Sequence, residues 1–174
     1  MKTAQLHCIK SMMLIVLLLS ISGLAFADSD YYDESVPPQP KAFYDINLTS
    51  PESMVDFLWV IDETYDLLIR KGAPPAKIKF VVSLRGLSVK FAEKDFGLRE
   101  GEEEYEDEGM QIREYLDGLL SKGVRIEACI ISCLWVGTDP ENLFDGIVVI
   151  DNAFASSIWY QTRGYALIPI SQLP

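Results

Sequence analysis

Short apolar runs alternate with segments of helical periodicity along most of the chain. Between residues 51 and 71 the apolar positions recur at spacings of three and four, which is typical of a helix that buries one face. Residues 78–84 are almost continuously apolar, as in a strand of a buried parallel sheet. The pattern predicts strands at 41–47, 78–84, 124–131, 147–150 and 165–170. Helical segments are predicted between them, at 51–71, 86–91, 112–120, 139–142 and 153–163.

The order of these elements predicts the fold class. Strands that alternate with helices form a mostly parallel sheet with helices on both faces. We therefore predict an α/β fold of three layers, α/β/α, around a mostly parallel five-stranded sheet. Phe154 and Ile158 are expected on the inner face of the last helix, which Asn152 caps, and the strand at 147–150 is expected to be buried. Pro169 places the last strand at an edge, because proline cannot donate a ladder hydrogen bond.

The first 27 residues have the features of a secretory signal peptide. Lys2 and Lys10 give a positive start, an apolar stretch covers 12–26, and residues 25–27 read Ala-Phe-Ala, a small-residue cleavage site. An uncleaved anchor helix is the alternative, but the stretch is short for a span of about 20 residues. We expect cleavage between Ala27 and Asp28, which implies a periplasmic or secreted protein that no membrane segment anchors after cleavage.

The mature chain is expected to have two parts. Residues 28–40 are acidic and proline-rich and are predicted to be flexible, and residues 41–174 are predicted to form the folded domain. The run at 99–109 is also acidic, and we expect a solvated loop or the fraying start of a helix there. Its spacing lacks the pattern of a calcium-binding loop, so no calcium site is predicted.

Composition excludes several classes of function. The chain has 15 basic and 26 acidic residues and a net charge of −11, so it lacks the basic surface that nucleic-acid binding needs. Its one histidine, His7, lies in the predicted signal peptide, so the mature chain cannot use Ser-His-Asp or Cys-His catalysis or a zinc site with imidazole ligands. The glycine motifs of dinucleotide-binding and phosphate-binding loops are absent. We predict no metal and no cofactor.

Cys129 is the best candidate for chemistry. It lies near the carboxyl end of the predicted third strand, where open α/β sheets place their ligand sites. A thiol there becomes a reactive thiolate if a helix N-terminus or a cation lowers its pKa. Arg85, after the second strand, and Lys90 could supply that cation. The alternative is a buried and inert cysteine.

Cys133 follows four residues later. If the segment is helical, the two thiols share a face, and a disulfide could form in an oxidising compartment although it would strain the helix. The alternative is that Cys133 is a small buried apolar residue.

Several segments, taken in order, resemble the DsrE/DsrF-like sulfur-relay family, in particular its exported members. They are GVRIEAC at 123–129, DPENL at 139–143, QTRGYALIP at 161–169, YDINLTSPES at 44–53 and FVVSLRGLSVKF at 80–91. The resemblance covers about residues 41–170.

The resemblance implies a three-layer α/β/α domain that forms homo-oligomers, often trimers or hexamers. In the sulfur-handling members a cysteine at this strand end accepts sulfur as a persulfide and passes it on, a role that carries over to Cys129. Sulfur donor and acceptor proteins would then be partners. Gly86 and Lys90 match a loop that faces the cysteine. Exported relatives often have a histidine where this chain has Arg85, and an apolar residue at the position of Cys133.

Two functions are therefore expected for the mature chain. The first is a sulfur carrier or thiol-based sulfur-binding protein that acts through Cys129. The second is an oligomeric binding module that keeps the fold without the chemistry.

Overall fold

The computed structural model describes residues 35–171, and there the predicted alternation of strands and helices is present. The strands are β1 (Lys41–Asn47), β2 (Lys79–Leu84), β3 (Arg125–Cys129), β4 (Val148–Ile150) and β5 (Ala166–Ser171). The helices are α2 (Pro51–Arg70), α3 (Ser88–Phe91), α4 (Glu106–Ser121), α5 (Ile130–Val136) and α6 (Ala153–Gln161). Short 3-10 turns occur at Pro75–Lys77, Glu103–Tyr105 and Pro140–Asn142. The predicted signal peptide, with its cleavage site between Ala27 and Asp28, lies outside the described residues.

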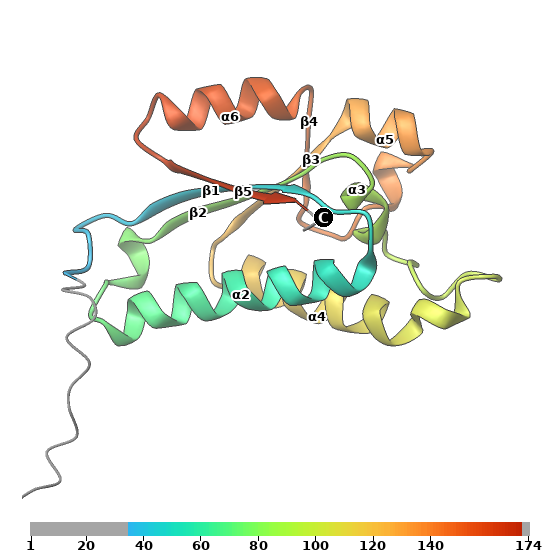
Figure 1. The fold of residues 1–174 in the computed structure, drawn as a ribbon, viewed down its shortest axis with the longest axis horizontal. Coiled ribbons are helices and arrows are strands. Elements are labelled where there is room, and N and C mark those ends of the chain that lie inside the picture. Colours follow the sequence, from blue (N-terminus) through green and yellow to red (C-terminus); the bar gives the residue numbers. More distant parts are fainter. Residues whose placement is uncertain (1–34, 172–174) are drawn as a thin grey trace, which may run out of the picture. The chain divides into compact units, whose positions relative to one another are not determined.

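The five strands form one sheet in the order β4-β3-β2-β1-β5. Every neighbouring pair is parallel, so the predicted α/β fold with a five-stranded sheet is confirmed, and the sheet is parallel throughout. Helices α2 and α4 cover one face, whereas α5 and α6 lie on the other side (Figure 1). Within 35–171, none of the helices combines the length and the apolar character needed to span a bilayer.

The two faces of the sheet are packed in different ways. On the α2 side, alternate strand residues such as Tyr44 and Phe80 enter one large apolar core, and the Tyr65 ring of α2 lies edge-on to Phe80. On the α6 side, the apolar cluster of the described residues is small and consists of Phe43, Val81 and Tyr160. Because buried apolar area is the main stabilising contribution, at about 25 cal/mol per Å², the α2 side holds the domain together.

Helix α2 begins where the sequence predicts. The Ser50 side chain accepts a hydrogen bond from the backbone N–H of Ser53, and Pro51 occupies the first turn. Met54 and Ile61 on its inner face are fully buried. The apolar spacing of residues 51–71 therefore reports a helix packed on the sheet.

Three details of the prediction are wrong. The third strand ends at Cys129, and residues 130 and 131 begin α5, because a short apolar run does not distinguish a strand from a buried helix. Phe154 and Ile158 point outward on α6, whose buried residues are Ala153 and Tyr160. Strand β4 lies at an edge and is partly exposed.

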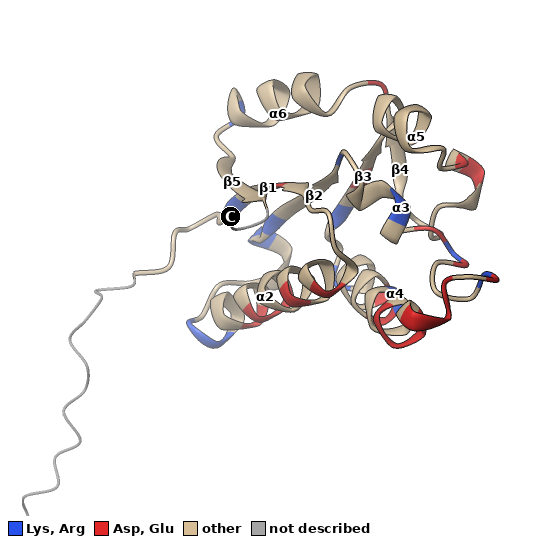
Figure 2. Cartoon of the chain, turned by 45° about the vertical axis from the view of Figure 1, so that its right-hand side comes forward, with Lys and Arg blue, Asp and Glu red and all other residues tan. Residues whose placement is uncertain are grey.

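The acidic run at 99–109 is mostly exposed, as expected, and residues 106–108 form the first turn of α4 (Figure 2). Glu102 is different, because its carboxylate accepts hydrogen bonds from Arg99 Nε and Nη2 at 3.0 and 2.9 Å. Arg99 Nη1 also lies 2.6 Å from Oε2 of Glu93, which is almost completely buried. One residue of the run therefore helps to hold the arginine that neutralises a buried carboxylate.

We expect Arg99→Ala to destabilise the domain by about 3 kcal/mol, because removing one partner leaves the Glu93 carboxylate buried and unpaired. Chemical denaturation of the mature protein measures the change in the free energy of unfolding. Arg70→Ala is the matched control, since the ion pair of Arg70 with Glu63 is exposed at both ends and is worth at most about 1 kcal/mol. Equal effects of the two substitutions would contradict a structural role for Arg99.

Candidate functional site

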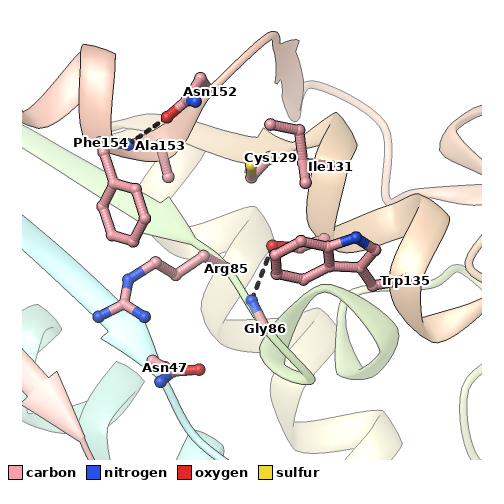
Figure 3. A pocket seen from close by; sticks show the side chains of 10 residues that line it. Asn47, Arg85, Gly86, Cys129, Ile131, Trp135, Asn152, Ala153 and Phe154 are labelled. Carbon is pink, nitrogen blue, oxygen red and sulfur yellow. Dashed lines mark hydrogen bonds between the residues drawn. The ribbon is translucent and has the colours of Figure 1, made fainter.

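A pocket of about 370 Å³ opens at the carboxyl edge of the sheet. Because β1, β2 and β3 are parallel and in register, the residues at or just after their ends meet there: Asn47, Arg85 and Cys129. The starts of α5 and α6 complete the wall (Figure 3). The remaining lining residues are Gly86, Ile131, Ser132, Trp135, Asn152, Ala153 and Phe154.

Cys129 is the last residue of β3 and the N-cap position of α5. Burial alone would raise the pKa of its thiol. Hydrogen bonds from the backbone N–H groups of Ser132 and Ala153, from the Ser132 hydroxyl and from the Ile131 N–H outweigh burial, so the pKa is lowered. The donors come from the starts of two helices, where backbone N–H groups have no partner within the helix. The pocket therefore favours the thiolate.

The Ser132 hydroxyl is oriented by Gly86. The Gly86 N–H donates to Ser132 Oγ at 2.8 Å, and this leaves the single hydroxyl proton of Ser132 free to point at the sulfur. Gly86 has φ +60°, and a Cβ at this position would lie on the Oδ1 of Asn47. A glycine is needed here because a side chain would collide and the backbone is left-handed. Gly86 thus acts on Cys129 through Ser132.

Asn152 determines which amide of α6 reaches Cys129. Its side-chain oxygen accepts hydrogen bonds from the N–H groups of Phe154 and Ala155 at 2.8 and 3.2 Å. The N–H of Ala153 is therefore left over for the thiol sulfur. The prediction that Asn152 caps this helix is confirmed.

Arg85 lines the pocket but its charge is already neutralised. Arg85 Nε and Nη2 donate to the two carboxylate oxygens of Asp45 at 2.6 and 3.1 Å, and the guanidinium carbon lies 5.4 Å from the centre of the Phe154 ring. Lys90 does not line the pocket, and its Nζ lies 3.5 Å from a carboxylate oxygen of Glu102. Arg85 and Lys90, the cations predicted to stabilise the thiolate, are therefore paired with carboxylates. Backbone N–H groups and a hydroxyl lower the pKa of the thiol instead.

Cys133 lies away from the pocket. It is completely buried in the large apolar core, and burial raises the pKa of its thiol. Both cysteines are free, so the disulfide that the sequence left open is not formed. The placement fits the interpretation of Cys133 as a small apolar core residue.

The arrangement offers a nucleophilic thiolate without an acid–base partner. Among its polar lining residues, Asn47 and Asn152 do not titrate, and Arg85 is held by Asp45. Within the described part of the chain, no cluster of three or more Cys, His, Asp or Glu residues could hold a metal ion. Thiol exchange needs only the thiolate and access to it, so this is the chemistry that the pocket supports.

Sequence reasoning identifies Cys129, Arg85 and Gly86 as candidates but misses Ser132, Ala153 and the aromatic wall. A signal for Ser132 exists, because it follows Cys129 by three residues at a helix start, where hydroxyl side chains are common. A signal for Ala153 exists too, because it follows the carboxyl end of β4 and so lies at the same edge of the sheet.

We expect Ser132→Ala to slow alkylation of Cys129 at neutral pH roughly tenfold and to move its pH profile to higher pH. A hydrogen bond to a charged group is worth about 1.5–3 kcal/mol, and this one stabilises only the thiolate. Timed labelling with iodoacetamide, quantified on the peptide that carries Cys129, measures both effects. Ser121→Ala is the control, since Ser121 is exposed and donates only to Gly118 O. An unchanged pH profile in Ser132→Ala would show that the hydroxyl does not act on the sulfur.

Comparisons with known proteins show the fold. A solved structure from Methanobacterium thermoautotrophicum, described as the protein of unknown function MTH1491, matches with a TM-score of 0.55 and 21% identity, over 76% of this chain and 99% of the other. The ychN protein of E. coli matches with a TM-score of 0.50 and 16% identity, also over 76% and 99%. No family model and no curated protein matches the chain. The chain therefore shares its α/β fold with these two proteins.

Proposed function

We propose that this protein is an exported member of the DsrE/DsrF-like family that carries sulfur as a persulfide on Cys129. The observation that carries the proposal is the set of hydrogen-bond donors that converge on the Cys129 thiol and lower its pKa at the floor of a pocket. The shared fold with two solved structures and the sequence resemblance support it. The features of residues 1–27 support a periplasmic or secreted location.

The reaction is an exchange at sulfur. The Cys129 thiolate attacks the terminal sulfur of a donor persulfide, R–S–SH, and a new S–S bond forms while the donor's S–S bond breaks. The electron pair leaves with R–S⁻, and the proton stays on the transferred sulfur. An acceptor thiolate removes the sulfur in the same way, so no external oxidant or reductant is consumed.

The pocket is suited to hold the product. The extra sulfur atom extends from Cys129 into a cavity of about 370 Å³ whose wall is largely apolar. Trp135, Ile131 and Phe154 contribute the apolar part of this wall. The N–H groups of Ser132 and Ala153, which lower the pKa of the thiol, favour negative charge at this end of the pocket.

A second function, an oligomeric binding module, is favoured by a different observation. Five large apolar side chains on α5 and α6 are exposed: Leu134 (74%), Trp135 (81%), Phe154 (64%), Ile158 (65%) and Trp159 (50%). Contiguous exposed apolar surface is typical of interaction sites. We propose that this surface, here called the α5–α6 surface, joins copies of the chain into a homo-oligomer in either function.

The two functions predict different behaviour of the cysteines. For a sulfur carrier, treatment with a persulfide donor adds about 32 Da, one sulfur atom, to the protein. We expect Cys129→Ser to abolish this adduct and rapid alkylation at little cost in stability. We expect Cys133→Ser to keep both and to lower stability by about 1–3 kcal/mol, because it buries a hydroxyl in an apolar core.

Intact mass spectrometry and thermal melts of the mature protein and both variants provide the test. A slowly alkylated Cys129 that takes up no sulfur would favour the binding module. An adduct that persists in Cys129→Ser would contradict the assignment of the carrier cysteine.

We expect the mature protein to be an oligomer, with a trimer or hexamer as the proposed size, and we expect Ile158→Glu to dissociate it. A charge in the centre of an apolar interface is strongly unfavourable. Light scattering across micromolar concentrations measures the mass. Val60→Glu, an exposed apolar position on the outer face of α2, is the control and should leave the mass unchanged. A monomer at all concentrations would contradict the proposal.

A further inference from the structure

Helix α6 is attached to the sheet by a small apolar cluster and by two hydrogen bonds to one residue of β3. The apolar cluster beneath it is small, with Phe43, Val81 and its own Tyr160, whereas the other face of the sheet has a large apolar core. A carboxylate, Glu127, also faces α6 from β3, the strand next to the β4 edge of the sheet. Glu127 is 1% exposed, so its charge is removed from water.

Both oxygens of the Glu127 carboxylate accept hydrogen bonds from neighbouring side chains. Ser156 Oγ donates to Oε2 at 2.6 Å, and the Tyr160 hydroxyl donates to Oε1 at 3.1 Å. Arg125 Nε donates to Oε1 at 2.6 Å and balances the charge. Ser156 and Tyr160 lie one helical turn apart, so the two hydroxyls on α6 both donate to the same buried carboxylate.

The same strand face carries the candidate site. Glu127 and Cys129 are two residues apart on β3, so both side chains point toward α6. Ala153 lines the same pocket as Cys129, and its backbone N–H is one of the groups that lower the pKa of the thiol. It is in the first turn of α6, and Ser156 follows it by three residues. The Glu127–Ser156 hydrogen bond therefore sets how closely the start of α6 approaches Cys129.

We propose that Glu127 is a positioning residue for Cys129, which holds the first turn of α6 in place through Ser156 so that the Ala153 N–H reaches the thiol sulfur. The proposal concerns the reactivity of the Cys129 thiolate and can be tested without sulfur transfer. It rests on the proposed function only for the biological role of that reactivity. No residue other than Glu127 is seen to bond both Ser156 and Tyr160 in residues 35–171.

Positioning and direct charge make opposite predictions. The carboxylate of Glu127, if it acted through its charge, would disfavour the thiolate, so its loss would make Cys129 more reactive. If it acts by positioning, its loss makes Cys129 less reactive. The other ionisable groups near the thiol are Arg85, which is paired with Asp45, and the buried Cys133 thiol. None of these changes in the variants below.

The test uses Ser156→Ala, which removes the hydrogen bond between Ser156 and Glu127 without changing any charge. We expect iodoacetamide labelling of Cys129 at neutral pH to slow about threefold or more, and its pH profile to move to higher pH. Ser156→Thr keeps a hydroxyl and should restore the profile. Ser157→Ala is the matched control on the same helix, since the Ser157 hydroxyl serves only Gln161.

Glu127→Gln and Tyr160→Phe extend the test, and a thermal melt shows that each variant is folded. Slower labelling in the folded Ser156→Ala protein supports positioning, and if that variant does not fold, Tyr160→Phe takes its place. An unchanged profile, or faster labelling, overturns the proposal. Uptake of sulfur from a persulfide donor is measured separately, so a wild-type protein that takes up none would refute the carrier function and leave the positioning result standing.

Discussion

The candidate site depends on the parallel register of three adjacent strands. Because β1, β2 and β3 run in one direction and are held by continuous backbone hydrogen bonds, Asn47, Arg85 and Cys129 arrive at one edge. The chain leaves this edge through helix starts, and each helix start brings N–H groups without a partner in the helix. A thiol at this position meets those groups without any dedicated residue.

The thiolate is therefore stabilised by dipoles and not by a nearby charge. A histidine or lysine at the pocket would lower the pKa of the thiol but would also exchange protons with it. Here the cation in the wall, Arg85, donates two hydrogen bonds to the Asp45 carboxylate and lies over the Phe154 ring. It shapes the wall of the pocket and leaves the sulfur to Ser132, Ala153 and Ile131. This explains how the described residues, among which there is no histidine, could still present a reactive cysteine.

The sequence predicts the fold well because hydrophobic periodicity reports burial directly. The apolar run of β2 reports a strand buried in the sheet and the helical spacing of α2 reports packing on the large core, and both elements are found where predicted. The same signal fails at α6. Phe154 and Ile158 have helical spacing, but the inner side of α6 is occupied by the hydroxyls that bind Glu127, so the apolar side faces out. Periodicity identifies an apolar side but does not identify what it packs against. The donors around Cys129 could not be predicted from the sequence for a related reason, since almost every residue has a backbone N–H group.

Charge and apolar exposure are segregated on this domain in a way that bears on assembly. A chain with net charge −11 repels its own copies, and its acidic residues gather on α2 and on the first turns of α4 (Figure 2). Helices α5 and α6 contain no charged residue. Two copies that meet through the α5–α6 surface keep their acidic helices on the sheet faces that point away from the contact. The same contact would close the exposed side of the Cys129 pocket, where Trp135 and Phe154 stand. In the proposed oligomer, assembly would therefore be tied to the site, because the uncharged surface that joins the copies also borders the Cys129 pocket.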